Sequence, residues 1–305
     1  MTAPAPANQP DADDDWTRTG PAGARRTWTS TSERRVTSTD ALRVVILMTF
    51  VLLALIPVVW LLLGSFKTPT ELAQRPISIL PQNWGLDNYI DALGRFNFTI
   101  YLRNSVLVTI GATVLTLAIN AMAAYGLAKY NFRGRNALFL LTLATIMIPL
   151  QVILIPVYQV VAQLGMVNSL WGLIIPAAAT PTGVFILRQY MLGIPDELIE
   201  AARVDGSGEF RTFLRIVLPL CRPALAVVAI LSVMWRWNDF LWPLVVAQSE
   251  SVYTLPVALA RFNAEETVPF NLILAMSVVT IVPVIILFLF FQRQITTGIA
   301  NTGIK

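Results

Sequence analysis

Long runs without a single ionisable side chain are the feature that most constrains this chain. Val44 to Phe66 contains 23 such residues, Asn104 to Ala128 contains 25, and Thr267 to Gln292 contains 26. About 20 helical residues cross the roughly 30 Å hydrocarbon layer of a bilayer. Because helices satisfy all their backbone hydrogen bonds internally, they are the usual way to cross it. These runs predict an all-α, polytopic membrane protein.

Two further apolar stretches do not fit a single charge-free helix. One is long enough for two spans, and the other contains charged residues. Residues 136–187 contain 52 charge-free positions, which suits two crossings at about 1.5 Å per residue. Gly, Asn and Ser cluster at residues 163–169, which places the turn there. We interpret the fifth span as one helix that carries Arg236 and Asp239. The six expected transmembrane helices are residues 44–66, 104–128, 137–162, 169–190, 220–247 and 268–292.

The distribution of basic residues predicts the orientation of these spans. Cytoplasmic loops of membrane proteins keep an excess of Lys and Arg. With the N-terminus inside, the inner segments hold 16 basic residues, the outer loops hold five, and one lies within the fifth span. We therefore expect a multi-pass protein of the cell (plasma) membrane with both termini cytoplasmic. The same asymmetry explains the net charge of +4 without a nucleic-acid partner.

The chain is expected to have a tail and one membrane domain. Residues 1–42 are rich in Ala, Pro, Thr, Asp and Arg without an apolar period, which predicts a disordered cytoplasmic tail. Its Arg pairs either contact anionic headgroups or are simply solvated. Residues 43–305 form the predicted transmembrane domain. One cysteine and no histidine exclude a disulfide framework, a Cys/His zinc site and His-dependent catalysis.

The expected cytoplasmic loop at residues 193–219 contains signs of a short amphipathic helix. Pro195 suits the first turn, and Glu200 lies near the positive end of the helix dipole. Asp205 and Gly206 form a stop signal, since glycine readily adopts the left-handed conformation that ends helices. Periodicity alone is equally compatible with a generic interfacial connector. The expected apolar face consists of Leu198, Ile199 and Ala202.

A spaced motif in this loop matches a known family. The EAA signature of ABC-importer permeases is matched in this loop, which follows the fourth of six expected spans. The matching residues are Glu200-Ala201-Ala202, then Gly206, Ile216 and Leu218-Pro219. Similar family-like segments occur elsewhere, among them Ser65-Phe66-Lys67-Thr68-Pro69, Ala123-Ala124-Tyr125-Gly126-Leu127-Ala128 and Trp237-Asn238-Asp239-Phe240-Leu241-Trp242-Pro243. From about residue 40 to residue 305, the chain resembles the smaller six-span permease subunit of maltose-type carbohydrate ABC importers.

The resemblance implies a type I ABC importer permease fold with a cytoplasmic coupling helix. It also implies a second permease that completes the pathway, two copies of an ABC ATPase as a homodimer, and an extracytoplasmic sugar-binding protein or lipoprotein. The chain has no Gly-rich sequence ending in Gly-Lys-Ser/Thr, so we expect ATP and Mg²⁺ to bind the partner ATPases. This chain would be no enzyme and would bind no cofactor. Permeases for polyols or glycerol-phosphate-type compounds, and a secondary transporter, are the alternatives.

The motif residues are the candidates for coupling to the ATPase. Small Ala201 and Ala202 would let a partner surface approach closely, and Glu200 would pair with a basic group there. Gly206 would turn the chain so that the next helix braces the loop. The full set of expected coupling residues is Glu200, Ala201, Ala202, Asp205, Gly206, Ile216, Leu218 and Pro219.

A second candidate site lies in the fifth expected span. Arg236 and Asp239 are three residues apart, and they either shape a gate or form a structural ion pair. The tryptophans here either stack on sugar rings or pack between helices. The candidates for the pathway or gate are Trp237, Asn238, Asp239 and Trp242.

Overall fold

The structure is a computed structural model that describes residues 38–76, 78–265 and 267–302, and every regular element in these ranges is helical. The all-α prediction is therefore confirmed for the described part of the chain. Contacts divide the chain into two units, residues 1–53 and residues 54–305. Most of the expected tail falls on residues 1–37, which lie outside the described residues.

Helix α1 (Ser38–Gly64) covers residues 44–64 of the first expected span, 44–66, and supplies all that is described of the first unit. Its Leu42–Gly64 segment is long and apolar enough to cross a membrane, with a mean hydropathy of 2.9. Pro57 lies inside this helix. Transmembrane helices tolerate such a proline because neighbouring groups can satisfy the freed carbonyl.

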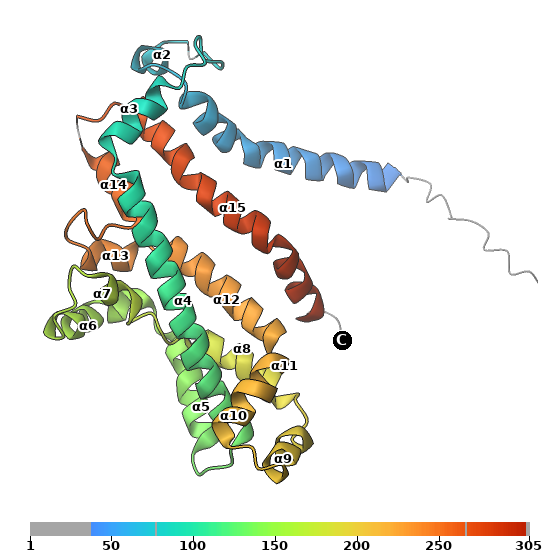
Figure 1. Ribbon diagram of the computed structural model, residues 1–305. Helices are drawn as coiled ribbons and strands as arrows, with labels where there is room; N and C mark the ends of the chain where they lie inside the picture. Colours follow the sequence, from blue (N-terminus) through green and yellow to red (C-terminus); the bar gives the residue numbers. More distant parts are fainter. Residues whose placement is uncertain (1–37, 77, 266, 303–305) are drawn as a thin grey trace, which may run out of the picture. The chain divides into compact units, whose positions relative to one another are not determined.

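Helix α4 (Phe98–Lys129) is the element around which the second unit is organised, as Figure 1 shows. Three buried clusters follow one another along it. The elements that pack on α4 or contribute to these clusters include α3 (Asp87–Arg95), α6 (Leu150–Gln163), α7 (Leu170–Ile174), α8 (Pro181–Leu192), α9 (Glu197–Val204), α12 (Arg222–Trp237), α13 (Leu241–Val246), α14 (Leu255–Ala264) and α15 (Phe270–Thr302). Each cluster joins α4 to elements distant in sequence, so α4 is the common core helix.

The third expected span is not one straight helix. It consists of α5 (Arg135–Ala144), the 3₁₀ turn η1 (Thr145–Met147) and α6, with a bend of 106° between η1 and α6. Ile148 is extended, with φ −85° and ψ 116°, because the following Pro149 disfavours the helical conformation at that position. A run of apolar residues shows that this stretch is hydrophobic, but it does not show that the helix breaks between η1 and α6.

The fourth and fifth expected spans are also interrupted. Residues 175–180 separate α7 from α8, and Pro181 occupies the first turn of α8, where its missing N–H costs nothing. Residues 238–240 separate α12 from α13, so the prediction of one continuous helix through Arg236 and Asp239 is wrong. Asn238 ends α12, and the Asp239 carboxylate accepts a 3.4 Å hydrogen bond from the Trp242 N–H at the start of α13.

The expected spans are therefore not six straight helices. Among the described residues, two helices are long and apolar enough to span a membrane, or up to four if each bent pair counts as one span. The second bent pair joins Glu209–Leu220 to α12 at 79°, and the apolar part of α15, Phe270–Ile286, is shorter. The remaining elements are α2 (Pro69–Ala73), α10 (Glu209–Thr212), the π-helix η2 (Phe213–Val217) and α11 (Leu218–Leu220).

Candidate coupling site

The short helix predicted in the loop at residues 193–219, which we call the coupling loop, is present as α9. Glu197 and Glu200 lie in its first turn, where carboxylates interact favourably with the helix dipole. At its other end the Gly206 N–H donates to the Arg203 carbonyl (3.0 Å), and the Ser207 N–H donates to the Ala202 carbonyl (2.9 Å). Gly206 has φ +77°, so the helix ends in a Schellman motif.

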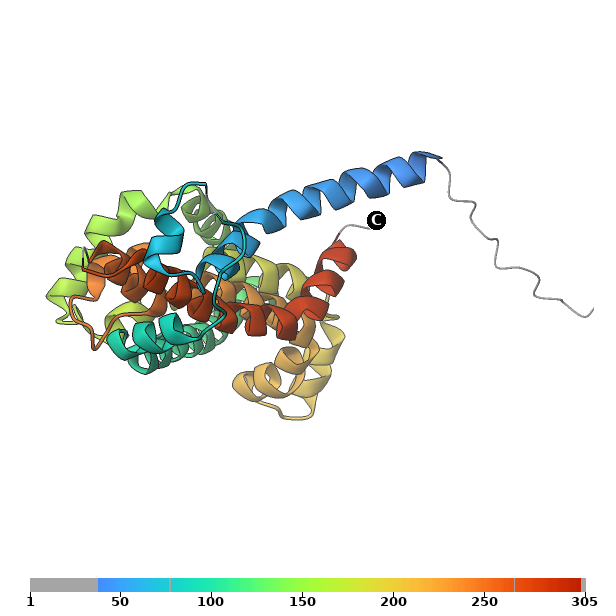
Figure 2. The same ribbon diagram turned by 90° about the horizontal axis from the view of Figure 1, so that it is seen from above.

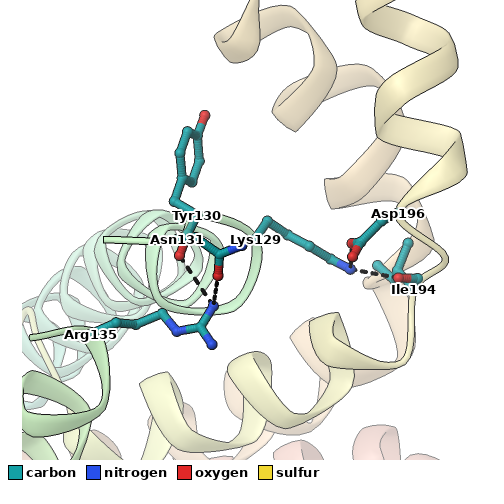
Figure 3. A network of polar contacts seen from close by, with 6 residues as sticks. All are labelled: Lys129, Tyr130, Asn131, Arg135, Ile194 and Asp196. Atoms are coloured by element: carbon teal, nitrogen blue, oxygen red, sulfur yellow. Dashed lines mark hydrogen bonds and ion pairs between the residues drawn. The ribbon is translucent and has the colours of Figure 1, made fainter. Parts of the chain in front are cut away.

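Lys129, the last residue of α4, holds the beginning of the coupling loop. Its ammonium donates to the Ile194 carbonyl (2.5 Å) and to the Asp196 carboxylate (2.6 Å), as Figure 3 shows. The Lys129 side chain is only 4% exposed, whereas that of Asp196 is 73% exposed. The Arg135 guanidinium, on the other side of the same turn, donates to the Tyr130 carbonyl (3.2 Å). The loop is thus attached to a stiffened end of α4.

Glu209 holds the coupling loop on the C-terminal side of α9. Its carboxylate accepts hydrogen bonds from the Tyr130 hydroxyl (2.5 Å) and the Arg203 guanidinium (2.8 Å), with the Tyr125 hydroxyl at 3.5 Å. The Arg203 and Tyr130 hydrogen bonds keep the pKa of Glu209 below its ordinary value. Burial, together with the bond to Glu209, raises the pKa of Tyr130. The loop is therefore attached to the C-terminal end of α4 on both sides of α9.

Two residues of α9, Leu198 and Ala202, differ from the prediction in their exposure to solvent. Ile199 and Ala202 are buried, and Ile199 belongs to the cluster formed by α4, α8, η2 and α12. Leu198, expected on the same face, is exposed instead. Because Ala202 is only 6% exposed, it packs within this chain and cannot present a surface to a partner in this arrangement. Glu200 and Ala201 remain on the exposed face, as expected.

The remaining apolar residues of the motif lie in η2 and α11, the helical segments that follow α10. Ile216 lies in the π-helix η2, and Leu218 packs against the same buried cluster that holds Ile199. Pro219 lies in α11 near the 79° bend that leads into α12. A π-turn places one extra residue in a helix, and such turns are frequent at functional sites. Asp205 is exposed at the end of α9. Figures 1 and 2 show the segment with α9 and α10 projecting from the other helices.

The candidates for the pathway or gate are divided between buried and exposed positions. Trp237 and Trp242 are buried in two different clusters, and the Trp242 indole N–H donates to the Gly172 carbonyl (3.0 Å). Both tryptophans therefore serve packing in this arrangement. Asn238 is exposed and donates to the Met234 carbonyl (2.8 Å).

Arg236 and Asp239 do not form the ion pair that was one of the two expectations. Among the residues that the structure describes, no salt bridge joins them. The Arg236 guanidinium instead donates to the Ala177 carbonyl (2.5 Å), in the non-helical segment between α7 and α8. Arg236 therefore satisfies a backbone group at the break in the fourth expected span.

A polar stripe on α4 is a feature that sequence reasoning missed. Its hydroxyl and amide side chains are all buried, although they lie in a charge-free apolar run. The stripe consists of Ser105, Thr109, Thr113, Thr116 and Asn120. The spacing of four, four, three and four residues was visible in the sequence and places them on one helix face.

Three members of the polar stripe bond backbone groups at the breaks or starts of neighbouring helices. The Ser105 hydroxyl accepts from the Leu255 N–H (2.8 Å), and the Thr116 hydroxyl donates to the Ala177 carbonyl (3.2 Å). Asn120 accepts from the Thr180 N–H (3.1 Å) and donates to the Thr180 hydroxyl (2.7 Å). Irregular backbone at membrane depth is tolerated only where such partners exist.

Comparison with known proteins agrees with this architecture. The family model described as "Binding-protein-dependent transport system inner membrane component" matches residues 120–300, more than half of the chain. The chain belongs to this family. The resemblance noted from the coupling-loop motif is thereby confirmed, and the chain is a membrane-embedded transport permease.

Curated relatives and solved structures extend this result. An arabinooligosaccharide transport permease of Halalkalibacterium halodurans is 42% identical over 256 residues, covering 83% of this chain and 92% of the relative. An sn-glycerol-3-phosphate transport permease of Brucella abortus is 30% identical over 266 residues, covering 84% and 94%. A chain of a bacterial ABC transporter that imports alginate superposes with a TM-score of 0.77 at 25% identity, covering 87% of this chain and 99% of that one.

Proposed function

We propose that this permease is one of two membrane subunits of an ATP-driven sugar importer, and that α9 transmits the work of partner ATPases to the pathway. One observation carries the proposal. The coupling loop projects from the helices, yet the contacts of Asp196 with Lys129 and of Glu209 with Tyr130 attach it to the C-terminal end of α4 on both sides of α9. Displacement of α9 by a partner would therefore move α4, which contacts α7, α8, α12 and α14.

The exposed surface of the coupling loop suits a protein partner. Glu200 and Ala201 lie on it, together with exposed apolar side chains at Val204 (87% exposed) and Phe210 (66% exposed). Exposed apolar residues rimmed by charges are typical of protein interfaces. The partner would be a homodimeric ABC ATPase that binds ATP and Mg²⁺ on the cytoplasmic side, where both termini of this chain would also lie.

The cargo is proposed to be a carbohydrate delivered by an extracytoplasmic binding protein. Permeases named for arabinooligosaccharides and for diacetylchitobiose are 42% and 32% identical to this chain. A structural relative, with a TM-score of 0.59, is an alginate ABC transporter in complex with a pentasaccharide-bound periplasmic protein. A glycerol-phosphate-type substrate is the second candidate, because permeases for sn-glycerol-3-phosphate are 30% identical over most of the chain.

The proposed mechanism is a shift between two packed arrangements. ATP-driven closure of the ATPases would move α9 and α4 together, because the coupling loop has little freedom relative to α4. The permease pair would then expose its pathway to the binding protein, and ATP hydrolysis would restore the inward-facing arrangement. Such a shift requires only that the partner binds the two arrangements with different affinity.

Charge reversal at Glu200 tests the proposal. The complete importer, reconstituted in liposomes with its binding protein, should lose ATP-dependent sugar uptake in Glu200→Lys while the chain still inserts and folds. Asp91→Lys is the matched control, since Asp91 is an exposed acid on α3 at the other end of α4. Uptake that is unchanged in Glu200→Lys would overturn the role of α9. Uptake by the wild-type importer without ATP would overturn the ABC importer itself.

A further inference from the structure

Three arginines gather where α4 ends and α5 begins, without an acidic partner. Arg133 is exposed in the turn between the two helices, Arg135 is the first residue of α5, and Arg188 comes from α8, which packs on both. In the part of the chain that the structure describes, no salt bridge involves any of the three. We call this cluster the arginine corner, and Figure 1 shows the helices that form it. Its charges repel one another, so an anion from outside the chain would stabilise it.

Arg188 is the buried member of the arginine corner, with only 8% of the residue exposed. Its Nε–H donates to the Leu127 carbonyl (3.1 Å), and its guanidinium lies over the Phe139 ring, 3.9 Å from the centroid. Phe139 in turn stacks on Phe185. The terminal nitrogens of Arg188 have no hydrogen-bond partner among the described residues, and neither is one of the enclosed polar atoms. Arg188 is therefore held firmly by its stem while the donors at its tip remain available.

Arg135 brings a second guanidinium to the same place. Arg135 and Phe139 are one helical turn apart on α5 and share a face of it. Because Arg188 lies over Phe139, the two guanidiniums are neighbours, and their charges oppose each other. The Arg135 Nη1 donates to the Tyr130 carbonyl (3.2 Å) and to the Asn131 side-chain oxygen (2.8 Å). Bonding the end of α4 thus occupies only part of each guanidinium and leaves further donors for a ligand.

The start of α5 adds the positive pole of a helix to the arginine corner. The N–H groups of Asn136 and Ala137 have no acceptor among the described residues, and Gly134, which precedes the helix, has no side chain to cap it. Unpaired N–H groups at a helix N-terminus attract anions. They reinforce the guanidiniums, which supply the full charges.

The surface of α5 beyond the arginine corner is apolar. Leu138, Leu140 and Leu141 are 50%, 63% and 65% exposed, and they lie in the third expected span. A free phosphate ion would contact the arginines and leave these leucines uncovered. A phospholipid would satisfy both, with its phosphate at the start of α5 and its acyl chains beside the leucines. The combination therefore favours a lipid over a soluble anion.

We propose that the arginine corner binds the phosphate of an anionic membrane lipid, whose acyl chains lie along α5. The planar fork of a guanidinium matches phosphate oxygens in geometry as well as in charge. The corner falls between the second and third expected spans, and basic pockets between transmembrane helices can bind anionic headgroups. Because the cluster contains no acid, a headgroup with net negative charge fits better than a zwitterionic one. Such a lipid would link α5 and α8 at the end of α4 that holds the coupling loop.

Photo-labelling with a lipid probe tests the arginine corner. The probe is phosphatidylglycerol with a diazirine in its acyl chain, added to the full-length protein in phosphatidylcholine nanodiscs. We expect labelling within residues 135–144, and competition by unlabelled phosphatidylglycerol. Arg188→Gln and Arg135→Gln should each weaken this competition about tenfold, because each removes charge-assisted hydrogen bonds. Arg222→Gln, at an exposed arginine of α12 outside the corner, is the matched control and should leave the competition unchanged.

Further variants and outcomes separate the possible occupants. Arg188→Lys keeps the charge and loses the planar fork, so it should weaken the competition less than Arg188→Gln. Arg135→Gln leaves the buried contacts of Arg188 in place, so it tests the site even if the Arg188 variants fold poorly.

Three results would overturn the proposal. The first is equal labelling by a phosphatidylcholine probe, or competition that Arg135→Gln leaves unchanged. The second is competition by inorganic phosphate at the same concentration, which would identify a soluble ligand. The third is loss of a partner permease in Arg135→Gln without labelling of α5 in the wild type, which would identify a subunit interface.

Discussion

The end and the middle of α4 hold their neighbours by different chemistry. At the end, the Lys129 ammonium and the Tyr130 hydroxyl attach the coupling loop by donating to the carboxylates of Asp196 and Glu209. In the middle, uncharged hydroxyls and an amide attach the breaks beside α7, α8 and α14. An ion pair near water needs little desolvation, whereas a charge at membrane depth is expensive. Each region therefore uses the kind of polar group whose desolvation its surroundings permit. The following predictions test that difference.

The largest effect is expected where the polar stripe meets α8. A Cβ added at Gly183 would lie 2.1 Å from the Asn120 amide nitrogen and 2.7 Å from the Thr180 hydroxyl. Gly183→Ala should therefore displace Asn120 from Thr180 and destabilise the protein by about 3 kcal/mol, through overpacking and lost hydrogen bonds. Thermal denaturation of the full-length protein in nanodiscs would measure it. Gly126→Ala, at a helical glycine with open space around it, should not lower the Tm.

A smaller effect is expected at the end of α9. Gly206 has φ +77°, so a side chain there costs roughly 1–2 kcal/mol. Gly206→Val should loosen the coupling loop and raise hydrogen exchange of the amides of residues 199–207 by about tenfold. Gly208→Ala is the control, because Gly208 has φ −68° and nothing lies within 4 Å of an added Cβ. Equal exchange in both variants would contradict the role of the left-handed turn.

Loss of the Lys129 ammonium should destabilise the coupling loop more than loss of its ion pair with Asp196. Lys129→Met leaves the buried Ile194 carbonyl without its donor, which costs about 1–2 kcal/mol. Asp196→Asn removes only the charge of an exposed partner, so its cost should stay below about 1 kcal/mol. Hydrogen exchange across residues 194–204 would rank the two variants. The reverse ranking would show that the ion pair, and not the carbonyl, holds the loop.

The smallest effect is a pH dependence at Glu209. Its pKa is lowered in the folded protein, mainly by the Arg203 hydrogen bond, so its contribution is present above the unfolded pKa. The contribution is lost as the pH falls through the folded pKa, which lies below the ordinary value. Protection factors of the coupling-loop amides, which are corrected for the intrinsic pH dependence of exchange, should therefore fall in acid in the wild type and depend less on pH in Glu209→Gln. Identical acid responses in both proteins would remove Glu209 from this role.

The sequence predicts the features that local chemistry decides. Pro195 and Gly206 are local signals, and α9 is found between them. Hydropathy cannot register the break at Pro149 or at Asn238, because an interrupted helix is as apolar as a straight one. The burial of Ala202 depends on packing against segments distant in sequence, so periodicity could not decide it. Only the polar stripe was readable and was missed.

The partners of the polar stripe have a consequence for how such permeases diversify. Thr116 bonds the carbonyl of Ala177, Asn120 bonds the N–H of Thr180, and Ser105 bonds the N–H of Leu255. These bonds are to main-chain atoms, which every residue except proline supplies in full. The side chains of residues 177–179 can therefore change without releasing the segment. A helix whose side chains bond the main chain of its neighbours therefore tolerates substitutions at residues 177–179 without loss of these contacts.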